Sequence, residues 1–227
     1  MNKDKAAAEK IEKFLEEKYG EEFVVYAIGG GYGTLTTNTL KADVYAKSRP
    51  DKMFDVEITK DLETIWDKYM NVLMEEKLDK VVTEMAKPIF GEEIYVRTAY
   101  SLGGLVFPDI ELNDRDMDPI EYSKHKKKAI EVIDLFIKTE KNIVKFEEAE
   151  KIVDFAELLN NKGLQNVDIT FFYIKPSEFE NLDNELESID NEIEYFSNSK
   201  KAFNVTWIER EYLKKDSIED VVNNFVH

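Results

Sequence analysis

A glycine-rich segment, Gly29-Gly30-Gly31-Tyr32-Gly33-Thr34, is the local feature of this 227-residue chain best suited to holding a ligand. Glycines let the backbone approach a bound group closely or take positive φ angles. A Walker phosphate-binding loop needs Lys and Ser or Thr directly after its last glycine, but Thr34 and Leu35 follow Gly33. A dinucleotide fingerprint needs a helix next, whereas strand-like residues follow. Two interpretations remain: a flexible hairpin connection, or a binding loop in which Tyr32 is an exposed aromatic contact.

A run of carboxylates between residues 109 and 118 has the density of oxygen ligands that hard cations such as calcium prefer. Its members are Asp109, Glu111, Asp114, Asp116 and Asp118. An EF-hand loop beginning at Asp114 would need glycine where Pro119 stands and glutamate where His125 stands, so the run fails both tests. Asp118 is better explained as a helix cap. We therefore interpret the run as a solvated linker and assign no metal site, with cation binding by these carboxylates as the alternative.

The histidines provide no catalytic signature. There are two, His125 and His227, and no recognisable spacing places a serine, threonine or carboxylate partner beside His125. A hydrolase triad therefore has no support. The lysine-rich stretch 124–128 around His125 is either a water-facing helix turn or a small basic patch that docks an anionic partner. No motif indicates a cofactor, and we interpret the protein as a non-enzyme.

The composition is that of a globular and strongly acidic protein. Hydrophobic residues make up 43% of the chain, which is too many for a disordered one, and the formal net charge is −17. This charge would repel free nucleic acid and anionic bilayers; it either confers solubility or favours a basic partner. The absence of cysteine excludes disulfides, zinc–thiolate sites, iron–sulfur clusters and cysteine nucleophiles. No apolar run approaches the about 18–20 residues needed to cross a bilayer, so no transmembrane segment is predicted.

Two segments with nearly the same opening residues predict two similar helix-and-strand units. Residues 8–14 are Ala-Glu-Lys-Ile-Glu-Lys-Phe, and residues 149–155 are Ala-Glu-Lys-Ile-Val-Asp-Phe. Each continues through a glycine, Gly20 or Gly163, into a strand-like run. Apolar intervals of three and four residues indicate helix, and period-two alternation indicates strand. The predicted fold class is α+β, with two related modules, each an amphipathic helix packed on a small, mostly antiparallel sheet.

The same patterns predict the elements and the domain organisation. Helices are expected over 4–19, 62–87, 119–138 and 146–160 and from Asp216 or Ser217, strands over 23–28, 40–46, 54–58, 93–100, 167–174, 192–196 and 203–208, and an acidic loop over 176–191. Residues 1–101 would form the N-terminal module, 102–118 a connection, and 119–227 the C-terminal module. The two modules are either separate or packed as one compact body. Trp66 and Tyr69, on the apolar side of the second helix, and Trp207 are expected to pack in the core.

Short motifs within residues 8–75 form a recurring layout. They are residues 16–25 (Glu-Glu-Lys-Tyr-Gly-Glu-Glu-Phe-Val-Val), the glycine segment 29–34, Asp43-Val44-Tyr45, Phe54-Asp55-Val56 and Asp67-Lys68-Tyr69. This layout resembles uncharacterised small lipoproteins and related exported proteins of Bacillus-like and other Firmicutes bacteria. The resemblance implies an extracytoplasmic, lipid-tethered domain without an enzymatic role. The sequence itself holds no signal peptide and no lipid-accepting cysteine. The expected location is the extracellular face of the membrane, through an N-terminal lipid, if a signal peptide was trimmed, and otherwise the cytoplasm.

We therefore expect a non-enzymatic binding domain, the extracytoplasmic part of a Gram-positive lipoprotein, that presents an acidic and partly aromatic surface to a protein or cell-envelope component. The glycine segment 29–34 and the acidic loop 176–191 are the expected contact surfaces, because functional contacts concentrate on loops held by rigid scaffolds. The alternative is an acidic intracellular immunity or inhibitor protein that neutralises a basic toxin by charge complementarity.

Overall fold

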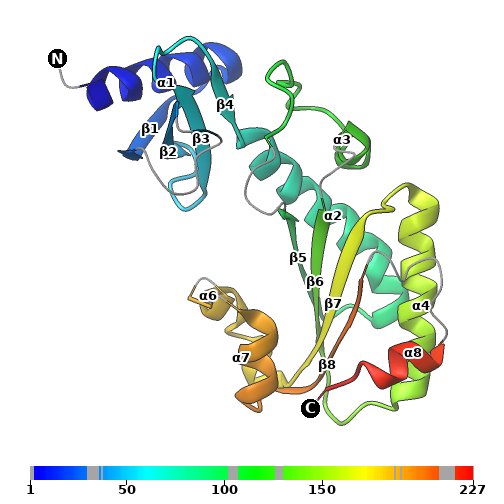
Figure 1. Cartoon of the computed structure of the whole chain (residues 1–227). Helices are drawn as coiled ribbons and strands as arrows, with labels where there is room; N and C mark the ends of the chain where they lie inside the picture. Colours follow the sequence, from blue (N-terminus) through cyan, green and yellow to red (C-terminus); the bar gives the residue numbers. More distant parts are fainter. Residues whose placement is uncertain are drawn as a thin grey trace. The chain divides into compact units, whose positions relative to one another are not determined.

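A computed structural model of the chain describes residues 3–29, 36, 38–101, 107–125, 130–186, 188–189, 191–209 and 218–226. The chain divides into two compact units, the first comprising residues 1–74 and 102–118 and the second residues 75–101 and 119–227. Each unit contains a four-stranded sheet with helices packed on it (Figure 1). The predicted α+β fold class with two similar modules is confirmed.

The first unit is an antiparallel sheet with one long helix. Its elements are α1 (Lys3–Tyr19), β1 (Phe23–Gly29), β2 (Thr39–Ala46), β3 (Met53–Thr59) and β4 (Ile65–Asp67), in the sheet order β1-β2-β3-β4. Apolar residues at helical spacing, Ile11 and Leu15 among them, are fully buried on α1, and Val44 and Val56 are fully buried on the strands. Gly20 ends the helix with a φ of 72°, as its position predicted.

The second unit has a mixed sheet. Its elements are α2 (Tyr69–Phe90), whose first turns belong to the first unit, β5 (Ile94–Ser101), α3 (Pro119–His125), β6 (Ile130–Lys138), α4 (Lys145–Lys162), β7 (Val167–Ile174), α5 (Pro176–Phe179), α6 (Leu182–Leu186), α7 (Glu192–Asn198), β8 (Ala202–Ile208) and α8 (Ile218–Asn223). The sheet order is β5-β6-β7-β8, and its pairs are antiparallel except for β6 and β7, which are parallel. The chain passes through α4 between these two strands, as a parallel pair requires.

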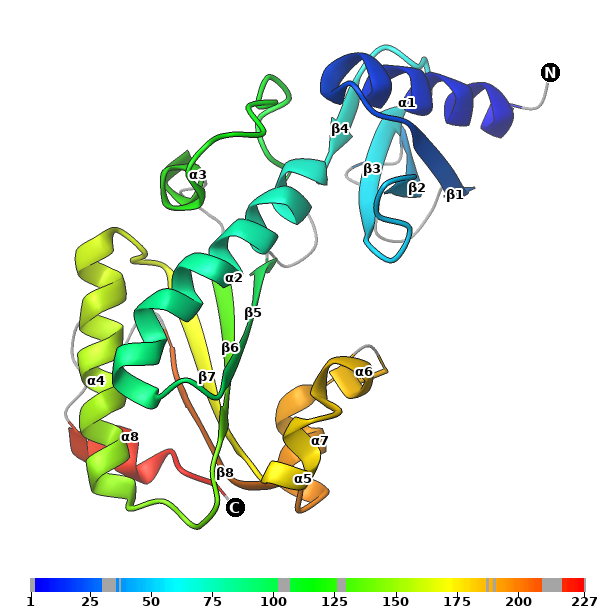
Figure 2. The same cartoon turned by 180° about the vertical axis from the view of Figure 1, so that it is seen from behind.

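Different helices cover the two faces of the second sheet. Figure 2 shows α2 and α4 on one face, and α5 to α7 on the other. On the first face, the rings of Phe155 (α4) and Phe171 (β7) lie 6.2 Å apart. On the second face, Phe136 and Phe172 stack at 4.6 Å, and Phe196 of α7 lies 5.7 and 5.4 Å from them. Both faces therefore contribute to the core.

The predicted helix over 119–138 is wrong over residues 130–138, which form β6. Their apolar side chains fit helical spacing, but they fit equally well a strand that is buried on both faces. Ile133 and Phe136 point to opposite faces of the sheet, and both are fully buried. A position between β5 and β7 provides that burial, which favours the β-branched and aromatic residues found here.

The predicted module boundary needs correction as well. β5 was expected to complete the N-terminal module, but it pairs with β6 along its whole length, from Ile94 opposite Ile137 to Ser101 opposite Ile130. The expected connection 102–118 belongs to the first unit. Arg115 Nη2 lies 3.0 Å from Glu21 Oε1. Pairing between distant segments, which local patterns do not reveal, decides both assignments.

The helix predicted over 62–87 begins only at Tyr69. Residues 65–67 form β4 instead, with Trp66 opposite Glu57 of β3. Thr59 Oγ1 accepts the amide protons of Glu63 and Thr64, at 3.2 and 3.0 Å, so a hydrogen-bonded turn takes the place of a first helical turn.

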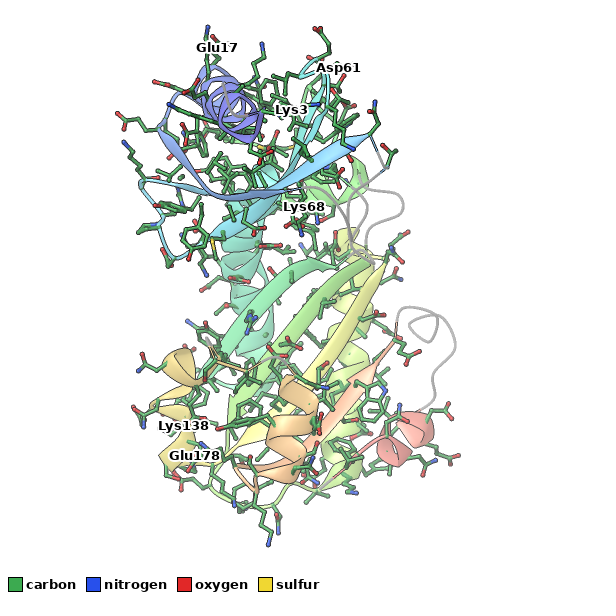
Figure 3. All side chains as sticks on the ribbon, turned by 60° about the vertical axis from the view of Figure 1, so that its left-hand side comes forward. Lys3, Glu17, Asp61, Lys68, Lys138 and Glu178 are labelled. Carbon is green, nitrogen blue, oxygen red and sulfur yellow. The ribbon has the colours of Figure 1, made fainter. Side chains whose placement is uncertain are left out.

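The segment 176–198 contains three short helices where a loop and a strand were predicted. Asn191 accepts the amide proton of Glu194 at 3.1 Å, and this side-chain cap favours a helix at 192–198. Leu182 and Leu186 are buried in the same cluster as Phe136, which holds the helices on the sheet. Lys138 of β6, labelled in Figure 3, donates to Glu180 at 3.1 Å just after α5.

Within the described part of the chain, no helix is both long and apolar enough to span a membrane.

Candidate functional site

The glycine segment proposed as a binding loop begins where β1 ends. Gly29 is the last residue of β1 and lies opposite Lys41 of β2. Gly30, Gly31, Tyr32, Gly33 and Thr34 lie outside the described residues. The binding role of this segment stays a prediction.

The carboxylates between residues 109 and 118 stabilise turns. Asp109 Oδ1 accepts the amide proton of Glu111 at 3.2 Å, and Asp114 Oδ1 accepts that of Asp116 at 2.9 Å. These short-range bonds are typical of aspartate in loops. Among the described residues, no group of three or more His, Asp or Glu side chains is placed to hold a metal ion.

The remaining candidate residues are distributed over separate elements. His125 is the last residue of α3, and its side chain is not among the described ones. Tyr69 is buried, as predicted. Trp66 and Trp207 are half-buried on β4 and β8, so Trp66 lies on a strand and not on the apolar side of the long helix. Trp66 and Tyr69 belong to the first unit and Trp207 to the second.

Within the described residues, the sheet edges other than β5 are short or covered in part, which hinders pairing with other chains there. On β1, a bulge at Tyr26 interrupts the ladder, and Glu12 Oε1 of α1 accepts the amide proton of Val25 at 2.9 Å. The opposite edge strand, β4, is only three residues long. On β8, Val205 exchanges two backbone hydrogen bonds with Val226 near the C-terminus, at 3.0 and 2.8 Å.

The remaining edge strand, β5, is covered only over its second half. Thr98 donates its backbone N–H to Asp79 Oδ1 at 2.7 Å, and Tyr100 donates to Glu75 Oε1 at 3.0 Å. Both carboxylates belong to α2, which therefore replaces a neighbouring strand along this half of the edge. Backbone groups of alternate strand residues point the same way, so those of Ile94 and Val96 also point outward, away from β6.

Ile94 and Val96 form what we call the edge section of β5. Within the described residues, neither outward amide has a hydrogen-bond acceptor. A groove of about 460 Å³ opens beside the edge section. It is lined by side chains of α2 and by the first residues of β5, namely Glu76, Asp79, Lys80, Thr83, Glu84, Ile94, Tyr95 and Val96. This arrangement combines unpaired backbone groups with space for an incoming segment.

The groove is acidic. Glu76, Asp79 and Glu84 line it, and Lys80 is the basic residue of the lining. The side chain of Glu84 is 76% exposed, with Lys87 at 3.8 Å. An exposed pair at that distance contributes little binding energy, so the carboxylate stays available to a cation in the groove.

A second polar cluster crosses the sheet face that carries α7. Arg97 of β5 lies opposite Asp134 of β6, which lies opposite Thr170 of β7. Arg97 Nη1 is 3.0 Å from Glu192 Oε1 at the start of α7. Burial raises the pKa of the Asp134 carboxyl to about 7, and the nearby Glu192 carboxylate adds to the rise, whereas Arg97 and the Thr170 hydroxyl oppose it. The cluster fastens α7 to the sheet and contains a carboxyl group that titrates near neutral pH.

Sequence reasoning missed both the edge section and the Asp134 cluster. The missed signals were weak. Glu75, Glu76 and Asp79 share one flank of α2 at helical spacing, and Asp134 interrupts an otherwise apolar run. Neither signal indicates which strand lies beside the helix, because the order of strands in the sheet is not a local property.

Comparison with known proteins indicates the fold but no activity. No protein-family model matches the chain, and no curated protein sequence matches it. The crystal structure of a DUF5037 family protein from Ruminococcus gnavus is similar, with a TM-score of 0.50 and 19% sequence identity. The alignment covers 95% of this chain and 97% of that one. Similarity at this level of identity supports the α+β fold alone.

Proposed function

We propose that the protein is a non-enzymatic binding domain that pairs with an extended segment of a partner protein along the edge section of β5. The observation that carries this proposal is the incomplete cover of that strand. α2 bonds the outward amides of Thr98 and Tyr100, while those of Ile94 and Val96 face a groove. In strand addition, main-chain hydrogen bonds provide affinity, and pockets for alternate side chains provide specificity.

The cover by α2 also limits the length of the bound segment. A partner strand can bond the N–H and C=O groups of Ile94 and Val96, but at Thr98 the carboxylate of Asp79 already occupies the donor. The paired stretch is therefore short, and its affinity depends strongly on side chains in the groove. Such a contact suits a regulated or reversible interaction better than a permanent one.

Two settings fit such a domain. The resemblance of residues 8–75 supports the extracytoplasmic part of a Gram-positive lipoprotein that binds a protein or cell-envelope component. The net charge of −17 supports the alternative, an intracellular inhibitor of a basic toxin. The gene distinguishes them: codons upstream that end in a Leu-x-x-Cys lipidation motif support the first, and a neighbouring toxin gene supports the second.

The variant Ile94→Pro tests the proposed function. Proline removes the outward N–H at the first residue of β5, where it is tolerated, and leaves the ladder with β6 intact. Unstructured peptides selected from a display library against the wild-type protein are expected to bind this variant about tenfold more weakly. The reason is one lost hydrogen bond together with steric exclusion of the added strand. Titration calorimetry measures the change.

The matched control is Ile94→Ala, which shortens the side chain but keeps the backbone N–H. It is expected to retain most of the affinity, and thermal melts of both variants show that they fold. Unchanged binding to Ile94→Pro contradicts the proposal, and so does a library that yields no binding peptide. If both variants lost the same amount of peptide affinity, the Ile94 side chain would be the contact, in place of strand addition.

A further inference from the structure

We propose that the segment bound at the edge section carries lysine or arginine at every second position. This inference rests on the proposed function, because it specifies the partner of that same site. It follows from which side of the added strand faces α2 and from the charges found there.

The side of the sheet that faces α2 is fixed by the strand register. Val96 pairs with Leu135, which pairs with Phe171, so these three side chains lie on one face of the sheet. The ring of Phe171 lies 5.6 Å from that of Phe90 at the end of α2. An added strand continues the pleat of the sheet. Every second side chain of the partner therefore points toward α2.

Those side chains meet carboxylates. Glu76, Asp79 and Glu84 line the groove on the α2 side. Lysine and arginine have stems long enough to cross a groove of this size and end in a cation. The net charge of −17 also attracts a basic segment from a distance and raises the rate of encounter. Lys80, within the same lining, repels an excess of cations, so the expected number of cations in the short paired stretch is small.

The other side chains of the partner meet a different surface. Tyr95 and Arg97 alternate with Ile94 and Val96 and therefore point to the opposite face. The Arg97 guanidinium, paired with Glu192 at 3.0 Å, lies on that face and disfavours a second cation beside it. Apolar or aromatic residues are favoured beside Tyr95. The predicted segment is therefore basic–apolar–basic, and a slip by one residue would place its cations on the wrong face.

Three capped synthetic peptides test this inference: alternating Lys-Val, Gln-Val and Glu-Val of equal length. We expect the lysine peptide to bind about tenfold more tightly than the glutamine peptide, and the glutamate peptide to bind most weakly. The advantage of lysine should shrink at about 0.5 M salt, because screening weakens charge pairs near the surface. Fluorescence anisotropy of labelled peptides measures all three affinities.

Protein variants identify the carboxylates responsible. The double variant Glu76→Gln/Glu84→Gln is expected to lower affinity for the lysine peptide about fivefold and to leave the glutamine peptide unchanged. The matched control is Glu157→Gln, which removes an exposed carboxylate of α4 outside the groove. Suppose that Glu157→Gln weakens binding of the lysine peptide as much, per carboxylate removed, as the double variant does. The attraction is then only that of the overall charge, and the inference is overturned.

The outcomes also separate this inference from the proposed function. If the lysine and glutamine peptides bind equally and Ile94→Pro abolishes both, strand addition stands and the basic pattern is overturned. If Ile94→Pro changes the affinity for neither peptide, the proposed function fails. A lysine preference that disappears in the double variant but not in Glu157→Gln supports the inference.

Discussion

Replacing Asp67 by alanine is expected to lower the free energy of unfolding of the first unit by about 3–5 kcal/mol. The Asp67 carboxylate is buried and accepts three hydrogen bonds. Lys18 Nζ donates at 2.8 Å, Tyr19 Oη at 2.7 Å and the backbone N–H of Tyr69 at 3.1 Å. The Lys18 side chain is itself only 9% exposed. Alanine would leave a nearly buried ammonium group and a buried hydroxyl without their acceptor, which is costly.

The two tryptophans allow each unit to be followed separately. Trp66 lies in the first unit and Trp207 in the second, so denaturant unfolding of Asp67→Ala in a Trp207→Phe background reports on the first unit. The control is Glu17→Ala on α1. Glu17 is labelled in Figure 3, and its side chain is 68% exposed in an ion pair with Lys13. We expect a change of about 0.5 kcal/mol or less for it. A similarly small loss for Asp67→Ala would contradict the expected penalty.

Replacing Asp134 by asparagine is expected to stabilise the protein by about 4 kcal/mol at pH 8 and to have little effect at pH 4. The pKa of Asp134 is raised from 3.8 to about 7 in the folded protein, mainly by burial. Between these two values the unfolded chain loses the proton while the folded chain keeps it, so the free energy of unfolding falls as the pH rises. Asparagine has a similar shape and cannot ionise, and it therefore avoids this loss.

The measurement is the difference in unfolding free energy between Asp134→Asn and wild type, determined from pH 4 to pH 8. Taking the difference cancels the contributions of other titrating groups. Asp154→Asn, which removes an exposed carboxylate on α4, is the matched control for the loss of one carboxylate. A constant difference for Asp134→Asn would contradict the raised pKa. Arg97, Glu192 and Thr170 are the polar groups that face Asp134.

Local patterns predicted those elements whose structure is decided locally. Gly20 and Gly163 were expected to end two helices, and both have positive φ angles, 72° and 105°. β2, β3 and β7 occupy almost the residue ranges that alternation and turn residues indicated. In these segments, side-chain periodicity and backbone preference agree, and no distant contact overrides them.

Predictions failed where a distant partner decides the structure. The run 130–138 fits either a helix or a strand, and only its position between β5 and β7 selects the strand. The prediction that placed the strand 93–100 in the N-terminal module failed for the same reason, because β5 belongs to the second sheet. The candidate site depends on both of these features, because the edge section exists only where β5 is the outer strand and α2 leaves part of it uncovered. A site of this kind has no sequence motif.

The edge section combines outward amides with an acidic groove, whereas parts of the other sheet edges are blocked against strand pairing. Carboxylates on helices bond outward amides at Val25, Thr98 and Tyr100, and Val226, near the C-terminus, bonds β8. Protection of this kind is widespread, since an unpaired edge promotes aggregation. The proposed partner segment would pair with the two outward amides that lie beside the acidic groove.

Backbone hydrogen exchange at β5, followed residue by residue with and without the alternating Lys-Val peptide, tests this explanation most directly. In the free protein, we expect the amides of Ile94 and Val96 to exchange fast, while those of Thr98 and Tyr100, bonded to α2, exchange slowly. Saturating peptide should slow exchange at Ile94 and Val96 by about tenfold or more and leave Thr98 and Tyr100 unchanged. Amides of Ile94 and Val96 that still exchange fast when the peptide is bound would contradict strand addition at β5.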